Sequence, residues 1–87
     1  MPGVASDLWY LRDRTGREAD FLVTLDRKPW LCAEAKVSEE AIDPALVYFR
    51  DRLKIPFVCQ VLLQGRRDFV EQGVRCLPAH DFLTALV

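Results

Sequence analysis

The 87-residue sequence lacks several features that would point directly to a class of protein. It has a single histidine, His80, and three widely spaced cysteines with no C-x-x-C pair. These counts argue against a zinc site and against a framework of disulfides. We therefore expect Cys32, Cys59 and Cys76 to be buried, reduced thiols. No glycine-rich phosphate loop or Walker motif is present, so nucleotide hydrolysis is not assigned to this chain.

Long apolar runs and a strong excess of either charge are also missing. No stretch approaches the roughly 20 apolar residues of a membrane span, and residues 1–7 lack the regions of a signal peptide. A net charge of -1 argues against a strongly basic nucleic-acid-binding protein, although basic residues can still cluster locally. The composition predicts one small cytoplasmic domain over residues 1–87, without a membrane partner. The abrupt start of the chain suggests a fragment or a C-terminal module of a longer protein.

Hydrophobic periodicity predicts an α/β fold. Residues 8–12 have strand composition, and alternation of polar and apolar residues continues over 18–25 and 30–37. Short polar turns separate these segments, so we expect an antiparallel three-strand meander. The two later strands have one apolar face each, formed by residues 19, 21, 23 and 25 and by residues 31, 33, 35 and 37.

The second half of the chain predicts a crossover unit. Asp43 and Pro44 are typical of a helix start, and an apolar stripe with helical spacing runs over residues 42–53. Residues 57–63 form a nearly unbroken apolar run, which favours a strand parallel to one of the meander strands. A short fifth strand over residues 73–77 and a closing helix over residues 78–87 complete the expected fold.

Charged residues gather on the other face of the second and third strands. A hairpin loop over residues 26–28 would place Asp20 opposite Glu34 and Glu18 opposite Lys36. Two carboxylates directly opposed on a sheet repel each other, so this arrangement needs a reason. A divalent cation supplies one, because Mg²⁺ is usually held by one or two carboxylates and several waters. Charges that merely keep an exposed strand soluble are the alternative interpretation.

The spacing also suits the chemistry of phosphodiester hydrolysis. Asp20 and Glu34 would hold the metal ion, which polarises the phosphoryl group and activates water. Lys36 lies two residues beyond Glu34 on the same strand face, about 6.6 Å along the strand. Its ammonium group could therefore meet the negative charge that develops on the same phosphate.

The order of these motifs resembles a known nuclease superfamily. Gly16-x-Glu18-x-Asp20-Phe21 on one strand and Glu34-x-Lys36 on the next, followed by a helix and an apolar strand, resemble the PD-(D/E)XK, or restriction-endonuclease-like, superfamily. More narrowly, the chain is similar to a domain of unknown function that follows the ATPase core in prokaryotic P-loop ATPases.

The resemblance implies a restriction-endonuclease-like core, an Mg²⁺- or Mn²⁺-dependent nuclease and a nucleic-acid substrate. Asp20 would bind the metal, Glu34 and Lys36 would form the E-x-K element, and Glu18 would be an accessory ligand. The upstream helix of the superfamily is missing, so we expect a homodimer that covers exposed apolar surface. The alternative is a non-catalytic docking or dimerisation module that works with an ATPase module.

Two further groups of residues are open to two interpretations each. Five basic residues could contact phosphates at a rim of the site, although solvated surface charges are the commoner case. Three aromatic residues could stack on bases, although packing in the core or in a dimer is commoner. The basic residues are Arg50, Arg52, Lys54, Arg66 and Arg67, and the aromatic ones are Trp9, Tyr10 and Trp30.

Overall fold

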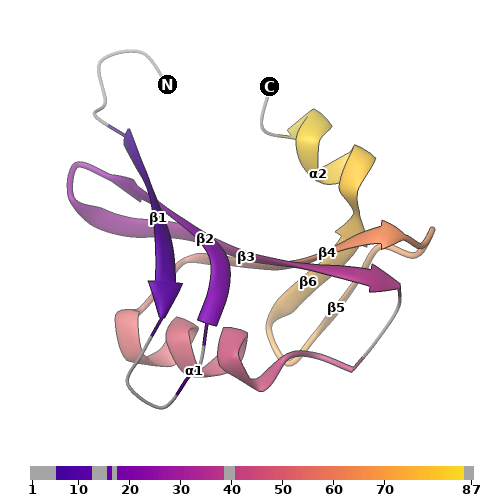
Figure 1. The fold of residues 1–87 in the computed structure, drawn as a ribbon, viewed down its shortest axis with the longest axis horizontal. Helices are drawn as coiled ribbons and strands as arrows, with labels where there is room; N and C mark the ends of the chain where they lie inside the picture. Colours follow the sequence, from indigo (N-terminus) through magenta and orange to yellow (C-terminus); the bar gives the residue numbers. More distant parts are fainter. Residues whose placement is uncertain (1–5, 13–15, 17, 39–40, 86–87) are drawn as a thin grey trace.

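The computed structural model describes residues 6–12, 16, 18–38 and 41–85, and for Ser6, Leu11, Arg12 and Glu18 it describes the backbone alone. These residues form one mixed six-stranded sheet with two helices, so the α/β prediction is confirmed (Figure 1). The elements are β1 (Ser6–Arg12), β2 (Glu18–Leu25), β3 (Lys28–Ser38), α1 (Pro44–Leu53), β4 (Phe57–Gln64), β5 (Phe69–Glu71), β6 (Val74–Pro78) and α2 (Ala79–Ala85). Within this described part, no helix is both long enough and apolar enough to cross a membrane.

The sheet has the spatial order β1-β2-β3-β4-β6-β5. The first three strands form the expected antiparallel meander, and β4 returns parallel to β3 after helix α1. Strand β6 is parallel to β4 and corresponds to the fifth strand expected from the sequence. The short strand β5, which pairs antiparallel with β6, was not predicted. Its hairpin turns at Gln72 and Gly73, both at positive φ, a conformation that glycine adopts without strain.

The hairpin between β2 and β3 is tighter than the sequence predicted. Leu25 pairs with Lys28, so the loop holds Asp26 and Arg27 only, and the expected loop over residues 26–28 is wrong by one residue. Both loop residues have positive φ, at 50° and 68°, as a type I′ turn requires. A register shift on β3 at Trp30 then restores the predicted pairing. Phe21 pairs with Ala33, Leu22 with Cys32 and Val23 with Leu31.

Arg27 is therefore an unfavourable residue at a position that suits glycine. We expect Arg27→Gly to raise the free energy of unfolding by about 0.5–1 kcal/mol. A left-handed conformation costs a residue other than glycine about 1–2 kcal/mol, and the substitution removes this strain. Glycine also makes the unfolded chain more flexible, which offsets part of the gain. Urea denaturation followed by circular dichroism measures this change. Asp26→Gly is the matched control, with a smaller gain because aspartate tolerates this conformation better. A loss of stability in Arg27→Gly would contradict the assigned turn.

Strand β2 carries an extra residue where Asp20 lies. The pairs on either side of the shift are Trp9–Leu22 and Leu11–Ala19. Asp20 and Phe21 together therefore stand opposite Tyr10, which is a β-bulge. The bulge reverses the alternation, so Ala19 is fully buried in the same cluster as Leu22. The prediction that Ala19 shares a face with Phe21 is wrong for this reason.

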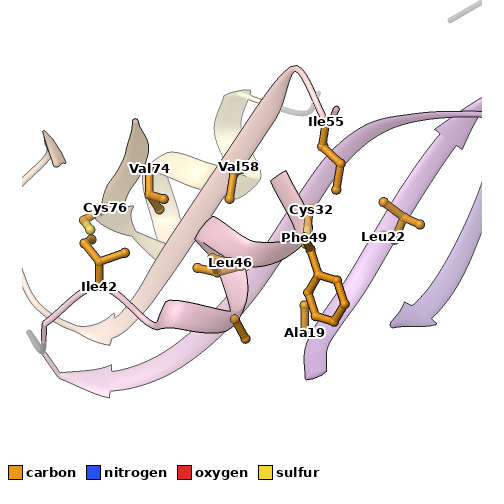
Figure 2. Packing of buried hydrophobic residues seen from close by; sticks show 11 residues of the cluster. Ala19, Leu22, Cys32, Ile42, Leu46, Phe49, Ile55, Val58, Val74 and Cys76 are labelled. Carbon is orange, nitrogen blue, oxygen red and sulfur yellow. The ribbon is translucent and has the colours of Figure 1, made fainter. Parts of the chain in front are cut away.

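Helix α1 covers one face of the sheet and forms the larger part of the core (Figure 2). The helix begins at an N-cap aspartate followed by proline, as predicted, and Leu46 and Phe49 point into the sheet with 0% and 3% exposure. The apolar cluster beneath it consists of Ala19, Leu22, Cys32, Ile42, Ala45, Leu46, Phe49, Ile55, Val58, Val74 and Cys76. This packing fixes the start of α1 against the ends of β3 and β4.

Helix α2 covers much less of the opposite face. It packs on β4 and β6 through Phe82, whose ring also lies 5.9 Å from that of Phe21. Phe21 and Val23, which belong to the apolar face that the sequence predicted for β2, are only half-buried because nothing else among the described residues covers this part of the sheet. Leu8 and Phe57 on the same face are 72% and 52% exposed.

This uncovered apolar surface bears on the expected homodimer, which stays a prediction. We expect light scattering at micromolar concentration to give twice the mass of one chain, because a second copy would remove apolar side chains from water. Leu8→Asp should shift the protein toward the monomer. A strict monomer in the wild-type protein would contradict the prediction.

Candidate functional site

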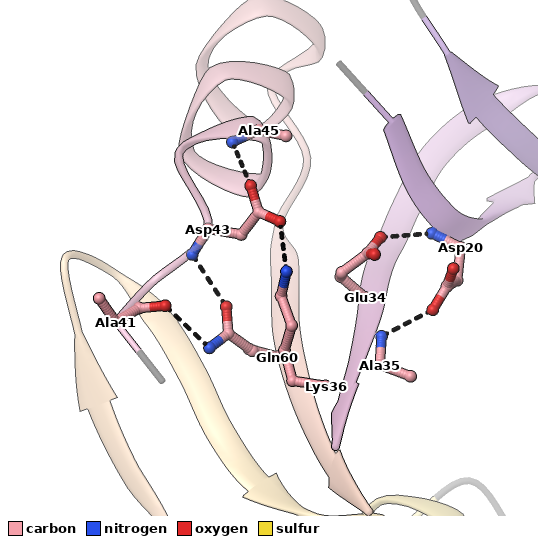
Figure 3. Close-up of polar contacts among 8 residues, drawn as sticks. All are labelled: Asp20, Glu34, Ala35, Lys36, Ala41, Asp43, Ala45 and Gln60. Carbon is pink, nitrogen blue, oxygen red and sulfur yellow. Dashed lines mark hydrogen bonds and ion pairs between the residues drawn. The ribbon is translucent and has the colours of Figure 1, made fainter. Parts of the chain in front are cut away.

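Polar side chains from three strands and one helix start form two neighbouring hydrogen-bonded groups, one that contains Asp20 and Glu34 and one that contains Lys36, Asp43 and Gln60 (Figure 3). Asp20 comes from β2, Glu34 and Lys36 from β3, and Gln60 from β4, where it is the register partner of Glu34. Asp43 is the N-cap residue of α1. Glu34 and Gln60 lie midway along the parallel ladder of β3 and β4, and Lys36 lies toward its carboxyl end, where it contacts the amino end of α1.

The side chains of Asp20 and Glu34 each bind a backbone amide of the opposite strand, and we call this reciprocal pair of hydrogen bonds the strand clamp. The backbone N–H of Asp20 donates to Glu34 Oε2 at 2.8 Å, and the backbone N–H of Ala35 donates to Asp20 Oδ2 at 2.8 Å. The register of β2 and β3 ends at the pair Phe21–Ala33, so the amides of Asp20 and Ala35 lie beyond the regular ladder and bind side-chain oxygens. Each carboxylate is fixed through one oxygen by a backbone amide of the opposite strand.

The two carboxylates also influence each other electrostatically. Burial raises the pKa of Glu34 above its ordinary value of 4.5, and the negative charge of Asp20 raises it further. The amide hydrogen bond from Asp20 and the positive charge of Lys36 act in the opposite direction. The repulsion expected from opposed carboxylates is therefore present, and a cation between them would relieve it.

Lys36 is held by Asp43. Its ammonium nitrogen lies 2.8 Å from Asp43 Oδ2, and the two side chains are 23% and 22% exposed. The other carboxylate oxygen of Asp43 accepts the backbone N–H of Ala45 at 2.9 Å and so caps α1. Partial burial alone would raise the pKa of Asp43, but the hydrogen bonds from Lys36 and Ala45 outweigh it and lower the pKa below its ordinary value of 3.8.

Gln60 anchors the segment that carries Asp43. Its side chain is fully buried, and its Oε1 accepts the backbone N–H of Asp43 at 2.9 Å. Its Nε2 donates to the carbonyl oxygen of Ala41 at 3.2 Å. The segment that leads into α1 therefore hydrogen-bonds to the side chain of Gln60 instead of to another stretch of backbone.

The structure places three of the four residues predicted for the site near one another, and it does not describe the side chain of the fourth. Asp20, Glu34 and Lys36 lie close enough to interact, as the shared influences on Glu34 show. The side chain of Glu18, the predicted accessory ligand, lies outside the described residues. Sequence reasoning assigned Asp43 only as a helix cap and missed Gln60. A polar residue within the apolar run of residues 57–63 was the available signal for Gln60.

The donor set fits a magnesium-like ion with few protein ligands. No group of three or more potential metal ligands occurs in the parts of the chain that the structure describes. Mg²⁺ nevertheless needs only one or two carboxylates, since it keeps several waters. Asp20 Oδ1 and Glu34 Oε1 are the oxygens that the two amide hydrogen bonds do not use. The protein would therefore offer a Mg²⁺ ion two carboxylate oxygens, one from each of two neighbouring strands.

Two of the five basic residues considered for a phosphate-binding rim, Arg50 and Arg67, have other contacts. Arg50 binds Asp51 and the carbonyl oxygen of Gln72 near the carboxyl end of α1, and a ten-residue helix places that end about 15 Å from Asp43. The guanidinium group of Arg67 stacks on Phe69. These positions favour surface charges over a phosphate-binding rim.

The cysteines and the exposed aromatics agree with the plainer interpretations. All three thiols are free and buried, as predicted, and burial raises the pKa of Cys32 to about 12, so it is a poor nucleophile. Trp9 donates from its indole nitrogen to Thr24 at 3.1 Å, and the rings of Trp30 and Phe57 make an edge contact at 5.6 Å. These aromatic contacts are within the fold.

Comparisons of the chain with protein-family models, with curated proteins and with solved structures found no match.

Proposed function

We propose that this chain is a restriction-endonuclease-like domain that cleaves phosphodiester bonds in nucleic acid with the help of Mg²⁺ or Mn²⁺. The observation that carries the proposal is the reciprocal pair of hydrogen bonds by which Asp20 and Glu34 each bind a backbone amide of the opposite strand, while the charge of Asp20 raises the pKa of Glu34. Such an arrangement raises the electrostatic energy of the apo site, and a divalent cation would lower it.

The roles of the residues follow from where they lie. Asp20 and Glu34 would hold the ion, which supplies positive charge for the phosphate group and a water of lowered pKa. Lys36 would direct its ammonium group at the phosphoryl oxygens that gain negative charge. Hydrolysis forms a bond from the water oxygen to phosphorus and breaks the bond to the leaving sugar oxygen, which takes up a proton.

The topology supports this proposal. An antiparallel meander, a crossover helix and a parallel strand are the core expected for a restriction-endonuclease-like domain, and Lys36 lies toward the carboxyl end of the parallel ladder of β3 and β4. Ligand sites in α/β sheets commonly lie at that end. DNA or RNA would be the substrate, and an ATPase module would be a further partner.

The direct test is a cleavage assay on circular plasmid, single-stranded DNA and RNA with Mn²⁺ or Mg²⁺. We expect cleavage that needs the metal and is lost in Glu34→Gln. Glutamine still accepts the Asp20 amide, so the apo variant should melt at the same or a higher temperature than the wild type. Asp26→Asn, in the exposed hairpin, should cleave like the wild type.

Two results would contradict the proposal in different ways. If none of the substrates is cut, the domain is better described as a docking or dimerisation module. If Glu34→Gln cuts as well as the wild type, the nuclease activity does not come from this site.

A further inference from the structure

We propose that Asp43 and Gln60 are positioning residues, which hold the Lys36 ammonium group in place at the end of β3. The inference rests on the proposed function, because positioning of Lys36 matters only if this ammonium group acts on a bound phosphate. It adds two residues to the site that the sequence motifs do not contain.

Asp43 does more than cap helix α1. An N-cap needs one acceptor oxygen, and Asp43 Oδ1 supplies it to the Ala45 amide at 2.9 Å. The second oxygen, Oδ2, receives the Lys36 ammonium at 2.8 Å. Serine, threonine or asparagine would cap the helix equally well, so the negative charge at this position is used by Lys36.

Gln60 fixes the place of Asp43. Gln60 is a polar residue, yet it is fully buried on the α1 face of β4 between the apolar residues Val58 and Leu62. A buried carboxamide is unfavourable unless both of its ends are hydrogen-bonded. Both ends bind the segment just before α1, at Ala41 and Asp43. The contacts therefore run from the rigid sheet to the helix cap and from the cap to Lys36 (Figure 3).

The ammonium group of lysine sits at the end of a flexible four-carbon chain, which does not hold one position by itself. Glu34 lies on the same strand face as Lys36 and interacts with it electrostatically, so an ammonium group without an anchor could turn toward that carboxylate. Binding to Asp43 keeps the charge at the helix side of the site. It thereby leaves Glu34 Oε1 accessible to a cation and keeps Lys36 preorganised for the phosphate.

The test combines a spectroscopic measurement with kinetics. Lysine ammonium groups held in hydrogen bonds exchange protons slowly with water, so they give sharp nitrogen–proton correlation signals in NMR. We expect one such signal to belong to Lys36, assigned by its loss in Lys36→Met. It should be lost or broadened in Asp43→Asn, which keeps the cap oxygen, and in Gln60→Met. Asp51→Asn, on the exposed side of the same helix, should leave it unchanged.

In the cleavage assay, Asp43→Asn should lower kcat at least about tenfold and leave KM within about twofold, because ground-state binding does not depend on the ammonium position. If Gln60→Met does not fold, Asp43→Asn alone decides. A Lys36 signal that persists in Asp43→Asn would overturn the proposal, as would a lost signal with unchanged kcat. If the wild type cleaves nothing, the proposed function fails, whereas the spectra still decide whether Asp43 and Gln60 hold Lys36.

Discussion

Lys36→Met is expected to reduce metal-dependent cleavage by at least about 100-fold, the loss typical of removing one group that stabilises transition-state charge. Methionine keeps most of the side-chain length and removes the positive charge. The Mn²⁺ affinity should stay within about tenfold of the wild type, because Lys36 is not a ligand. The free energy of unfolding should fall by about 1–3 kcal/mol, since the substitution leaves a largely buried oxygen of Asp43 without its donor.

The assay compares single-turnover cleavage rates with Mn²⁺ affinities from calorimetry. Lys28→Met, at the exposed start of β3, is the matched control and should cleave at the wild-type rate. If Lys36→Met cleaves normally, its ammonium group has no part in the reaction. If the variant instead loses Mn²⁺ binding altogether, Lys36 is needed for the site itself and the division of roles is wrong.

The largest effect on stability is expected for Leu46→Ala. Leu46 has no exposed surface and packs between α1 and the sheet, so its truncation should lower the free energy of unfolding by about 2.7–5 kcal/mol. A domain of this length has a total stability of only about 4–13 kcal/mol. The variant should therefore be close to unfolding under mild conditions, and α1 should lose its fixed place beside the site.

Urea denaturation followed by circular dichroism gives this value, and Leu83→Ala is the matched control. The same truncation at Leu83, which is 61% exposed on α2, should change stability by about 0.5 kcal/mol or less. Equal effects at the two positions would mean that α1 does not pack on the sheet in the way described.

Much of the fold follows from hydrophobic periodicity, because the buried faces are continuous in sequence. The meander, the helix start at Asp43 and a later strand parallel to one of the meander strands were all predicted from such patterns. The bulge at Asp20 and the two-residue turn at Arg27 were not. Both depend on single backbone conformations that tertiary contacts impose, and neither residue type signals them.

The site was predictable in its motif and not in its connections. The alternation of β2 and β3 brought Asp20 near Glu34, although side-chain clamps rather than a regular backbone ladder join the strands there. Asp43 and Gln60 join the site through the helix cap and the fourth strand. Contacts of this kind link residues far apart in the chain, and local periodicity does not encode them.

Calorimetric titration of Mn²⁺ into the apo protein tests the proposed metal site without any need for cleavage, because Asp20 and Glu34 are the proposed ligands of the cation. We expect the wild type to bind Mn²⁺ and Asp20→Asn to bind at least about tenfold more weakly, although asparagine can still accept the Ala35 amide and so preserve the strand clamp. Asp26→Asn should bind like the wild type. Absence of Mn²⁺ binding by the wild type, or equal affinity in Asp20→Asn, would contradict the metal site.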